Sequence, residues 1–170
     1  MATVYSLSQF LLQDNDPEMI SVTTTGEKVN PVFRFQDIIQ PELNLNLLKG
    51  LQQHLGLKRP TRLQSIFLGL ACEPLFHPLI VQCPPTSEKI RCYAFTLLLH
   101  IKTSVKQPQA LCIVPSKEDG EEVLKAVQEM GIFMDISGVV TDNKVKGDEI
   151  TSQVVIGTPA VVVNLFFLKG

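Results

Sequence analysis

The stretch QALCIVPSKEDGEEVLKAVQEMG, residues 109–131, decides the fold class. It begins with the continuous apolar run from Ala110 to Val114, which is typical of a strand buried on both faces. A helix is predicted from Lys117 to Met130, because apolar residues recur there on one helical face. A buried strand followed by an amphipathic helix is the repeating unit of an α/β domain.

The same alternation extends to both sides of this stretch. Upstream, the run from Leu79 to Cys83 predicts a strand, and the pattern from Lys89 to Ile101 predicts a helix. Downstream, strands are predicted from Met134 to Val140 and from Gln153 to Ile156. A last helix is expected after Gly157-Thr158-Pro159, ending near Lys169. The sequence therefore predicts an α/β domain with a mainly parallel sheet covered by helices on both faces.

Two further helices are predicted before the first strand. One opens at Pro41 and Glu42, runs to about His54 and ends at Gly56. The other runs to Leu70 and is capped by Thr61, whose hydroxyl can accept the free amides of the first turn.

Residues 1–30 form a separate acidic segment, which we expect to be flexible. They hold four acidic residues and one basic residue, a net charge of −3, and the other 140 residues hold 14 basic and 13 acidic residues, a net charge of +1. Residues 5–12 are expected to form a helix against a partner, and residues 23–26 a turn or coil. Neither part has the basic excess of a protein that binds nucleic acid mainly through phosphates, although a local basic patch stays open.

Composition limits the other classes of function. With 170 residues and 45% hydrophobic residues the chain is one globular domain, and it has no apolar run of the ~20 residues that cross a bilayer. The four cysteines share no C-x-x-C spacing and do not pair with the three histidines at zinc-ligand spacing. We therefore expect no metal site, and reduced thiols in a reducing compartment.

Four segments, in this order, resemble the DEAD-box RNA helicases. They are Arg59-Pro60-Thr61-Arg62-Leu63-Gln64 (the adenine-reading Q motif), Cys83 to Ile90 (the phosphate-binding loop A-x-T-G-x-G-K-T), Pro115-Ser116-Lys117-Glu118 (the RNA-contacting P-T-R-E-L-A) and Ile156-Gly157-Thr158-Pro159-Ala160 (the RNA-contacting G-T-P-G). The resemblance covers about Val32 to Gly170 and is greatest to the members that export mRNA at the nuclear pore. It implies residues 31–170 form a RecA-like three-layer domain, incomplete at its C-terminal side because the chain ends before the D-E-A-D segment.

The phosphate-binding loop departs from the family pattern at the positions that hold nucleotide. Thr86 and Glu88 replace two glycines, Ile90 replaces the hydroxyl that binds magnesium, and two prolines stiffen the loop. The resemblance therefore implies a vestigial nucleotide site, for which the candidates are Gln64, Thr86, Ser87 and Lys89. We expect loss of ATP and magnesium binding, no cofactor, no catalytic residue and no enzyme activity. Two of the candidates have plainer interpretations, Lys89 as a solvated helix-start lysine and Gln64 as a partner of local backbone.

The RNA-contacting segments depart less from the family pattern than the phosphate-binding loop does. The candidate contacts are Ser116, Lys117 and Thr158. Lys117 replaces an arginine and loses its bidentate fork, Asp119 adds an acid, and Ala160 replaces a glycine at a helix start. Thr158 can equally act as a helix cap. We expect weak or no direct RNA binding.

These features favour a non-catalytic interaction module, an adaptor in nuclear RNA export. Its partners would be RNA-export or nuclear-pore proteins, and its location the nucleus, the cytoplasm or the nuclear envelope, with no membrane insertion. Two alternatives stay open. One is a divergent RNA-dependent ATPase that uses Lys89 and Gln64, and the other is an RNA-binding domain without ATPase activity.

Overall fold

The computed structural model describes residues 3–6, 21–24, 31–38, 43–72, 81, 87–142 and 150–166. Its strands are β1 (Thr3–Ser6), β2 (Ser21–Thr24), β3 (Ala110–Ile113), β4 (Gly138–Val140) and β5 (Val154–Gly157). Its α-helices are α1 (Leu45–Lys49), α2 (Arg62–Ala71), α3 (Ser87–Leu99), α4 (Lys117–Met130) and α5 (Pro159–Phe166), together with a 3-10 turn η2 (Phe35–Asp37) and a π-helical turn η3 (Gly50–His54). In these ranges, no helix is both long and apolar enough to cross a membrane.

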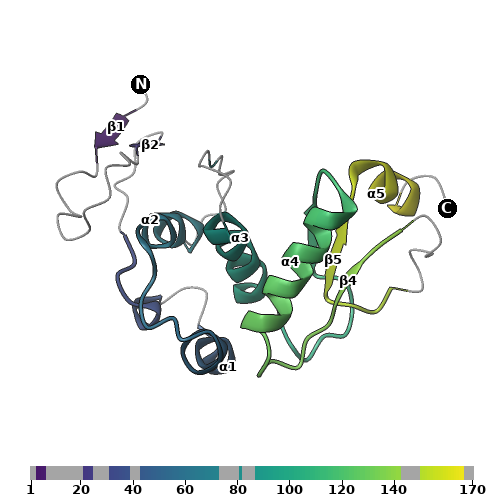
Figure 1. Ribbon diagram of the computed structural model, residues 1–170, viewed down its shortest axis with the longest axis horizontal. Helices are drawn as coiled ribbons and strands as arrows, with labels where there is room; N and C mark the ends of the chain where they lie inside the picture. The colour runs from purple at the N-terminus through teal and green to yellow at the C-terminus, as the bar shows by residue number, and fades with distance from the viewer. Residues whose placement is uncertain are drawn as a thin grey trace.

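The central sheet is parallel, as predicted. Its three strands follow the order β3-β5-β4, and Leu111 pairs with Val155, which in turn pairs with Val139. Helix α4 packs on one face of β4 and β5, and α3 packs against α4 (Figure 1). This arrangement confirms the α/β class, with an open sheet.

The two faces of the sheet are covered unequally. Val154 and Ile156 join the main core on the α4 face, whereas Val155 packs with Leu165 of α5 on the other face. Side chains alternate along a strand, so Leu111, the neighbour of Val155, points to the α5 face. There Leu111 and Ile113 remain exposed. The part of the sheet formed by β3 is therefore covered on one face only by the described residues.

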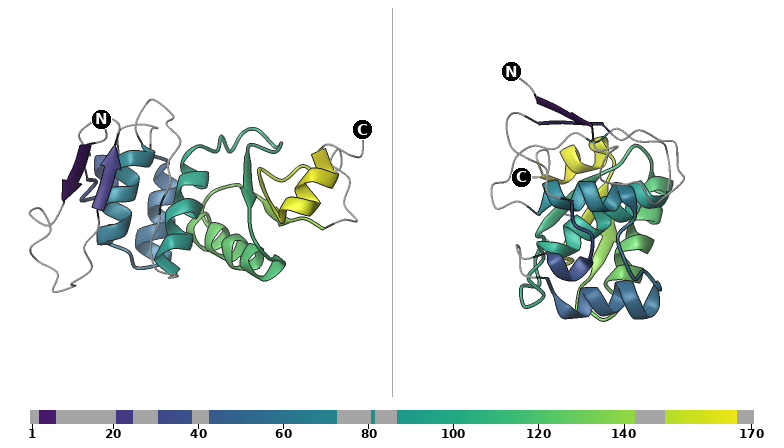
Figure 2. Two further views of the ribbon diagram at one scale, coloured as in Figure 1. Left: turned by 90° about the horizontal axis from the view of Figure 1, so that it is seen from above. Right: turned by 90° about the vertical axis from the view of Figure 1, so that its left-hand side faces the viewer.

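The main core joins this sheet to the helical part of the molecule. Figure 2 shows α1, α2 and α3 gathered at one end and the sheet with α5 at the other. Phe35 is buried in the core, with its ring 5.7 Å from the ring of Phe95 on α3. Gly50 lies so close to the end of α4 that an added Cβ would overlap the Met130 carbonyl oxygen.

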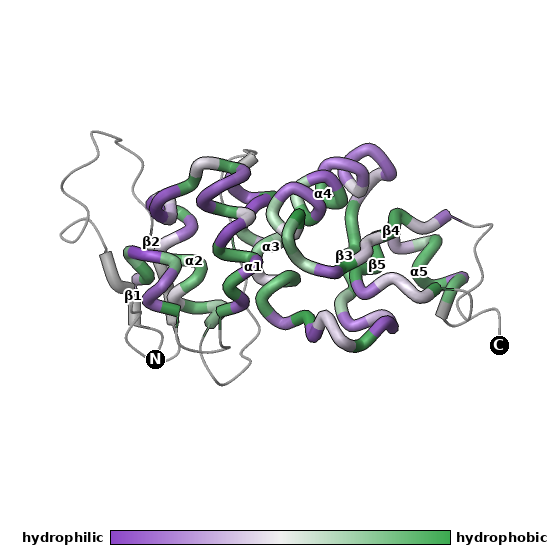
Figure 3. The backbone as a smooth tube through the Cα atoms, turned by 90° about the horizontal axis from the view of Figure 1, so that it is seen from below, coloured by the Kyte–Doolittle hydropathy of each residue, from purple (hydrophilic) through white to green (hydrophobic). Residues whose placement is uncertain are grey.

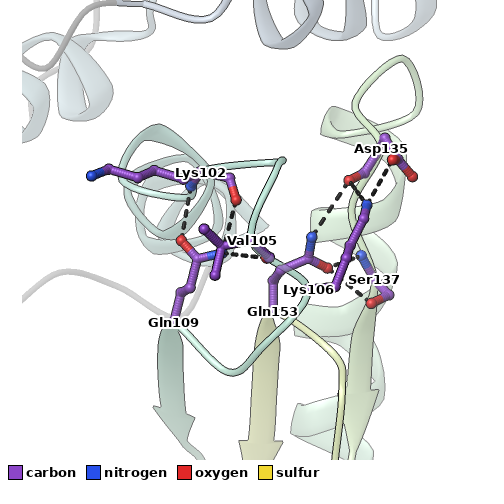
Figure 4. A network of polar contacts seen from close by, with 7 residues as sticks. All are labelled: Lys102, Val105, Lys106, Gln109, Asp135, Ser137 and Gln153. Atoms are coloured by element: carbon purple, nitrogen blue, oxygen red, sulfur yellow. Dashed lines mark hydrogen bonds and ion pairs between the residues drawn. The ribbon is translucent and has the colours of Figure 1, made fainter.

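A polar network fixes the edge of the sheet where the strands begin (Figure 4). The buried Gln153 side chain accepts hydrogen bonds from the Ser137 amide and hydroxyl, both at 2.9 Å. The Gln109 side chain bonds the backbone of Lys102 and Val105. Lys106 forms an exposed ion pair with Asp135 at 2.7 Å. The loops before all three strands are thus held in place by side-chain bonds.

Several predicted elements differ from the structure. The first helix begins at Leu45, because the Asn44 side chain accepts the Asn46 amide and caps it, and the helix continues into the π-helical turn η3. The predicted start at Pro41 and Glu42 lies outside the described residues. Residues 5 and 6 lie in β1 rather than in a helix, and residues 23 and 24 lie in β2 rather than in a turn, because the two segments pair antiparallel. The strand predicted over 134–140 is confined to 138–140, since residues 131–133 form a turn.

Other predicted boundaries agree closely. Helix α4 matches its predicted range, and the helix predicted from Lys89 begins two residues earlier, at Ser87. Gly56, at φ 67°, follows the π-helical turn and ends it as expected. Of the predicted strand over 79–83, only Val81 is described, and it has no secondary structure. The segments from 7 to 12 and from 167 to 170 also lie outside the described residues.

Candidate functional site

The structure brings the three RNA-contact candidates to one edge of the sheet. Parallel strands end at the same edge, and ligands of open α/β sheets bind beyond it. Ser116 and Lys117 follow β3, and Thr158 follows β5. The two strand ends are joined directly, because the Val114 amide donates a 3.0 Å hydrogen bond to the Gly157 carbonyl.

Thr141 closes the same edge after β4, and sequence reasoning did not single it out. Its amide and its hydroxyl both donate to the Ile156 carbonyl, at 2.7 and 3.0 Å, and the side chain is buried. An added Cβ on Gly157 would be 2.7 Å from the Thr141 hydroxyl oxygen. In the sequence, Thr141 is only a hydroxyl residue that follows two valines. Many strands end in this way, so the pattern does not show which group the hydroxyl bonds.

Ser116 is engaged within its own helix. It is the N-cap of α4, where its hydroxyl oxygen accepts the Asp119 amide at 3.1 Å. The same hydroxyl donates to the Asp119 carboxylate at 2.6 Å. The positive end of the α4 dipole thus already has a carboxylate of this chain beside it. A phosphate at this helix start would compete with that carboxylate.

Lys117 lies among acids rather than in a basic patch. Residues 117–122 hold one lysine and four carboxylates, a net charge of −3. The Lys117 ammonium group is 3.9 Å from the Glu121 carboxylate, and both side chains are exposed, so the pair contributes little stability. Figure 3 shows the hydrophilic colour of much of α4. The local field at this helix start is therefore unfavourable for a polyanion.

Thr158 occupies the N-cap position of α5. Its carbonyl accepts the Val162 amide at 3.0 Å, and Pro159 follows as the first helical residue. Thr158 therefore caps the helix through its backbone carbonyl, which agrees with the predicted role as a helix cap. Ala160 is exposed in the first turn of the same helix.

Gln64 forms a capping box with Thr61 at the start of α2. The Thr61 hydroxyl accepts the Gln64 amide at 3.3 Å, and the Gln64 side-chain oxygen accepts the Thr61 amide at 3.1 Å. The residue is only 4% exposed. Of the two interpretations of Gln64, the structure shows the bond to local backbone.

A small cavity lies beside Gln64 and is no larger than a water site. Its volume is about 10 Å³, which has room for at most one water molecule. It is lined by Phe35, Leu51, Gln64, Leu68, Arg91, Cys92, Phe95 and Met130. Phe35, at 1% exposed, is also part of the main hydrophobic core.

The first turn of α3 holds the remaining nucleotide candidates. Ser87 begins the helix, and Glu88 and Lys89 follow it half-buried. Ile90 packs against the main hydrophobic core. Thr86 and the side chain of Ser87 lie outside the described residues, so the structure places only Lys89 and Gln64 of this candidate set, on the packed helices α3 and α2.

No cluster of metal-ligating side chains occurs among the described residues. Burial raises the pKa of the Cys72 thiol to about 11 and also raises the pKa of Cys112, while Cys92 is buried. These three described cysteines are free thiols, as predicted. A raised pKa keeps a thiol protonated at neutral pH, which disfavours both nucleophilic and metal-binding chemistry.

Comparisons with known proteins identify homologues. No protein-family model matches the chain. It is 31% identical over 138 residues to the ATP-dependent RNA helicase dbp5 of Schizosaccharomyces pombe, which covers 80% of this chain and 27% of that protein. It is 30% identical over 162 residues to the DEAD-box ATP-dependent RNA helicase 38 of Oryza sativa, which covers 90% of this chain and 32% of that protein. The chain thus spans about a third or less of these relatives.

Solved structures give the same relationship. Saccharomyces cerevisiae Dbp5 bound to RNA and ADP-BeF3 matches with a TM-score of 0.70 at 28% identity, over 81% of this chain and 35% of that chain. The yeast splicing factor Prp28 matches with a TM-score of 0.71 at 19% identity, over 87% of this chain and 38% of that chain, which shows the fold alone. The chain is therefore a homologue of the DEAD-box RNA helicases, and its α/β domain has their RecA-like fold.

Proposed function

We propose that this chain is a non-catalytic, helicase-like interaction module that acts as an adaptor in nuclear RNA export. The observation that carries the proposal is the first turn of α3, where Lys89 lies between an acid and a core residue. Glu88 puts a carboxylate where the family loop would hold the phosphates of ATP. Ile90, which packs against the core, stands where the family has the hydroxyl that binds magnesium. Two like charges about 4 Å apart repel by about 4 kcal/mol at an effective dielectric constant near 20.

The adenine side of the proposed vestigial site supports the same conclusion. The Gln64 side-chain oxygen already accepts the Thr61 amide, and the cavity beside it is smaller than a purine ring. Binding adenine there would require Gln64 to exchange one buried hydrogen bond for another, with little net gain.

The proposed partners follow from solved complexes of a relative. Saccharomyces cerevisiae Dbp5 has been solved with Gle1 and IP6, and also with Nup159, Gle1, IP6 and ADP. We expect this chain to bind counterparts of these proteins, in the nucleus, the cytoplasm or at the nuclear envelope.

Isothermal titration with ADP and magnesium tests the non-catalytic part of the proposal. We expect no heat of binding for the chain and none for its Lys89→Ala variant. Low-micromolar binding that Lys89→Ala abolishes would instead support the divergent ATPase, for which the retained Lys89 is the favouring observation. The adaptor part is tested separately, by measuring binding of purified counterparts of Gle1 and Nup159 without nucleotide.

An RNA-binding domain without ATPase activity is the other candidate, because Ser116, Lys117 and Thr158 lie at one edge of the sheet. Filter binding of poly-uridine RNA at two salt concentrations tests it, since phosphate contacts weaken steeply with salt. We expect weak binding that Glu118→Gln strengthens by removing one charge beside Lys117. Glu129→Gln, at the other end of α4, is the matched control. Tight binding that Lys117→Gln abolishes would favour this alternative.

A further inference from the structure

The outer edge of β3 has no partner strand among the described residues. In the order β3-β5-β4, β3 is an end strand and pairs with β5. The Ala110 and Val114 amides donate 3.0 Å hydrogen bonds to carbonyls on the side of β5. Backbone groups along a strand point alternately to its two sides, so the amides and carbonyls of Leu111 and Ile113 point to the outer side. This edge can therefore accept another strand.

The same two residues also present apolar side chains. Leu111 is 44% exposed and Ile113 is 56% exposed, both on the α5 face of the sheet. The strand consists of Ala-Leu-Cys-Ile and carries no charge, proline or glycine that would protect an edge. Pro108 and Pro115 bound it, so pairing is confined to the residues between them. One short surface thus offers both backbone groups and apolar side chains.

The two ends of β3 carry opposite charges. At its start, the Gln109 side chain bonds the amide and the carbonyl of Lys102, both at 2.9 Å, and so holds Lys102 beside the strand. Figure 4 shows the exposed Lys102 side chain on the outer side of β3, whereas Lys106 reaches Asp135 on the side of β4. At the other end of β3, residues 117–122 have a net charge of −3.

We propose that the outer edge of β3 pairs antiparallel with the same edge of a second copy of this chain. In the register centred on Cys112, Leu111 of each copy lies opposite Ile113 of the other, and each such pair exchanges both of its backbone hydrogen bonds. This register uses all the outward backbone groups of Leu111 and Ile113. Their side chains then pack across the junction on the α5 face. The contact has two-fold symmetry, so it closes at two copies.

The charges favour this arrangement over other occupants. Antiparallel pairing brings Lys102 of each copy to the acidic end of the other copy's β3, whereas a parallel copy would place lysine beside lysine. An unrelated extended peptide can bond the same edge, but it matches both ends only if a base precedes it and acids follow it. Strand β4 of another copy does not match, because Asp135 precedes it and Asp142 follows it.

This inference goes beyond the proposed function and does not depend on it. Titration with ADP and the experiment below can therefore fail independently.

The test is sedimentation velocity of the whole chain over a wide range of concentrations. The variant is Ile113→Lys, which places a charge on the paired edge. The matched control is Ile132→Lys, the same substitution at an isoleucine outside the sheet that is 50% exposed. Circular dichroism melting shows whether both variants remain folded.

A second measurement on the same samples tests the register and needs no change at the edge side chains. Cys112 of each copy would lie opposite Cys112 of the other in a pair without hydrogen bonds, with Cα atoms about 4.5 Å apart. That distance lies within the roughly 4.4–6.8 Å that a disulfide spans. Diamide, an oxidant that takes up two electrons and two protons for each disulfide, should therefore cross-link the dimer through Cys112.

We expect a reversible dimer for the chain and for Ile132→Lys, and dimerisation weaker by about tenfold or more for Ile113→Lys. The cross-linked dimer should disappear in Cys112→Ser and remain in Cys72→Ser. Four results would overturn the proposal. They are a monomer at all concentrations, an equal loss in Ile132→Lys, a series of species larger than a dimer, or a cross-link that persists in Cys112→Ser.

Discussion

At the residue scale, two glycines show two different reasons why a position in this fold excludes a side chain. Gly50 and Gly56 lie six positions apart in the sequence, yet each position requires glycine for a different reason. Gly50 has ordinary helical backbone angles but no space for a side chain, whereas Gly56 has open space but a positive φ.

Gly50→Ala is expected to destabilise the protein by about 3 kcal/mol, because the new Cβ would overlap the Met130 backbone and push η3 away from α4. Gly56→Ala is expected to cost only about 1 kcal/mol, the price of a left-handed conformation. Urea unfolding of both variants measures the difference. If Gly50→Ala were stabilising, as an alanine is in an open helix, the close packing of η3 on α4 would be wrong.

Cys72 gives a pH dependence with a definite sign. Burial raises the pKa of its thiol from an ordinary 9.0 to about 11, so the folded protein favours the protonated form. The stability from this group is complete below pH 9 and is lost as pH rises from about 9 towards 11. We expect Cys72→Ser to flatten the fall in melting temperature over this range. A wild-type profile without any decline above pH 9 would contradict the raised pKa.

At the element scale, the parallel strands depend on the loops that precede them. Gln153 lies directly before β5, and its side-chain oxygen satisfies two groups of Ser137, directly before β4. These two bonds join the starts of neighbouring strands across 16 positions of the sequence.

Gln153→Leu is expected to cost about 2 kcal/mol, because it removes the buried side-chain oxygen that accepts two hydrogen bonds from Ser137, each worth about 1 kcal/mol. Gln109→Leu, at the equivalent place before β3, should cost about 1 kcal/mol, since Gln109 is exposed and water can replace its bonds. Urea unfolding of the two variants tests this order. Equal costs would mean that burial does not distinguish the two amides.

At the scale of the whole molecule, one hydrophobic core joins the helical end to the sheet. It contains Leu47 of α1, Leu51 of η3, Leu68 of α2, Leu98 of α3, Val127 of α4 and Ile156 of β5. We therefore expect one cooperative unfolding transition in urea, with coincident curves from far-UV circular dichroism and from Tyr93 fluorescence in a Tyr5→Phe variant. Tyr93 packs against this core on α3, so it reports on the helical end. An earlier midpoint for the tyrosine signal would mean that the two ends unfold separately.

Much of the fold was predictable from local pattern. The ranges of α4 and β3, the Thr61 cap and the Gly56 stop all rest on interactions within a few residues, which the sequence displays directly. The errors have tertiary causes. A strand over 134–140 is favoured by its composition, but only residues 138–140 pair with β5. The segment that includes Tyr5 pairs with a strand about 20 residues away, which no local pattern reveals.

The features of the candidate site also divide into those that the sequence shows and those that depend on the tertiary structure. The sequence by itself determined the departures in the phosphate-binding loop and the order of the family segments, because these depend on residue identity alone. The bonds between Gln64 and Thr61 and between Ser116 and Asp119 span three residues and belong to local helix caps. Only the tertiary structure decided that Ile90 packs in the core and that the ends of β3 and β5, with Ser116 and Thr158 after them, lie at one edge of the sheet. The physical reason is that a side chain's role depends on which groups surround it, and those groups are brought together by packing between segments distant in the sequence.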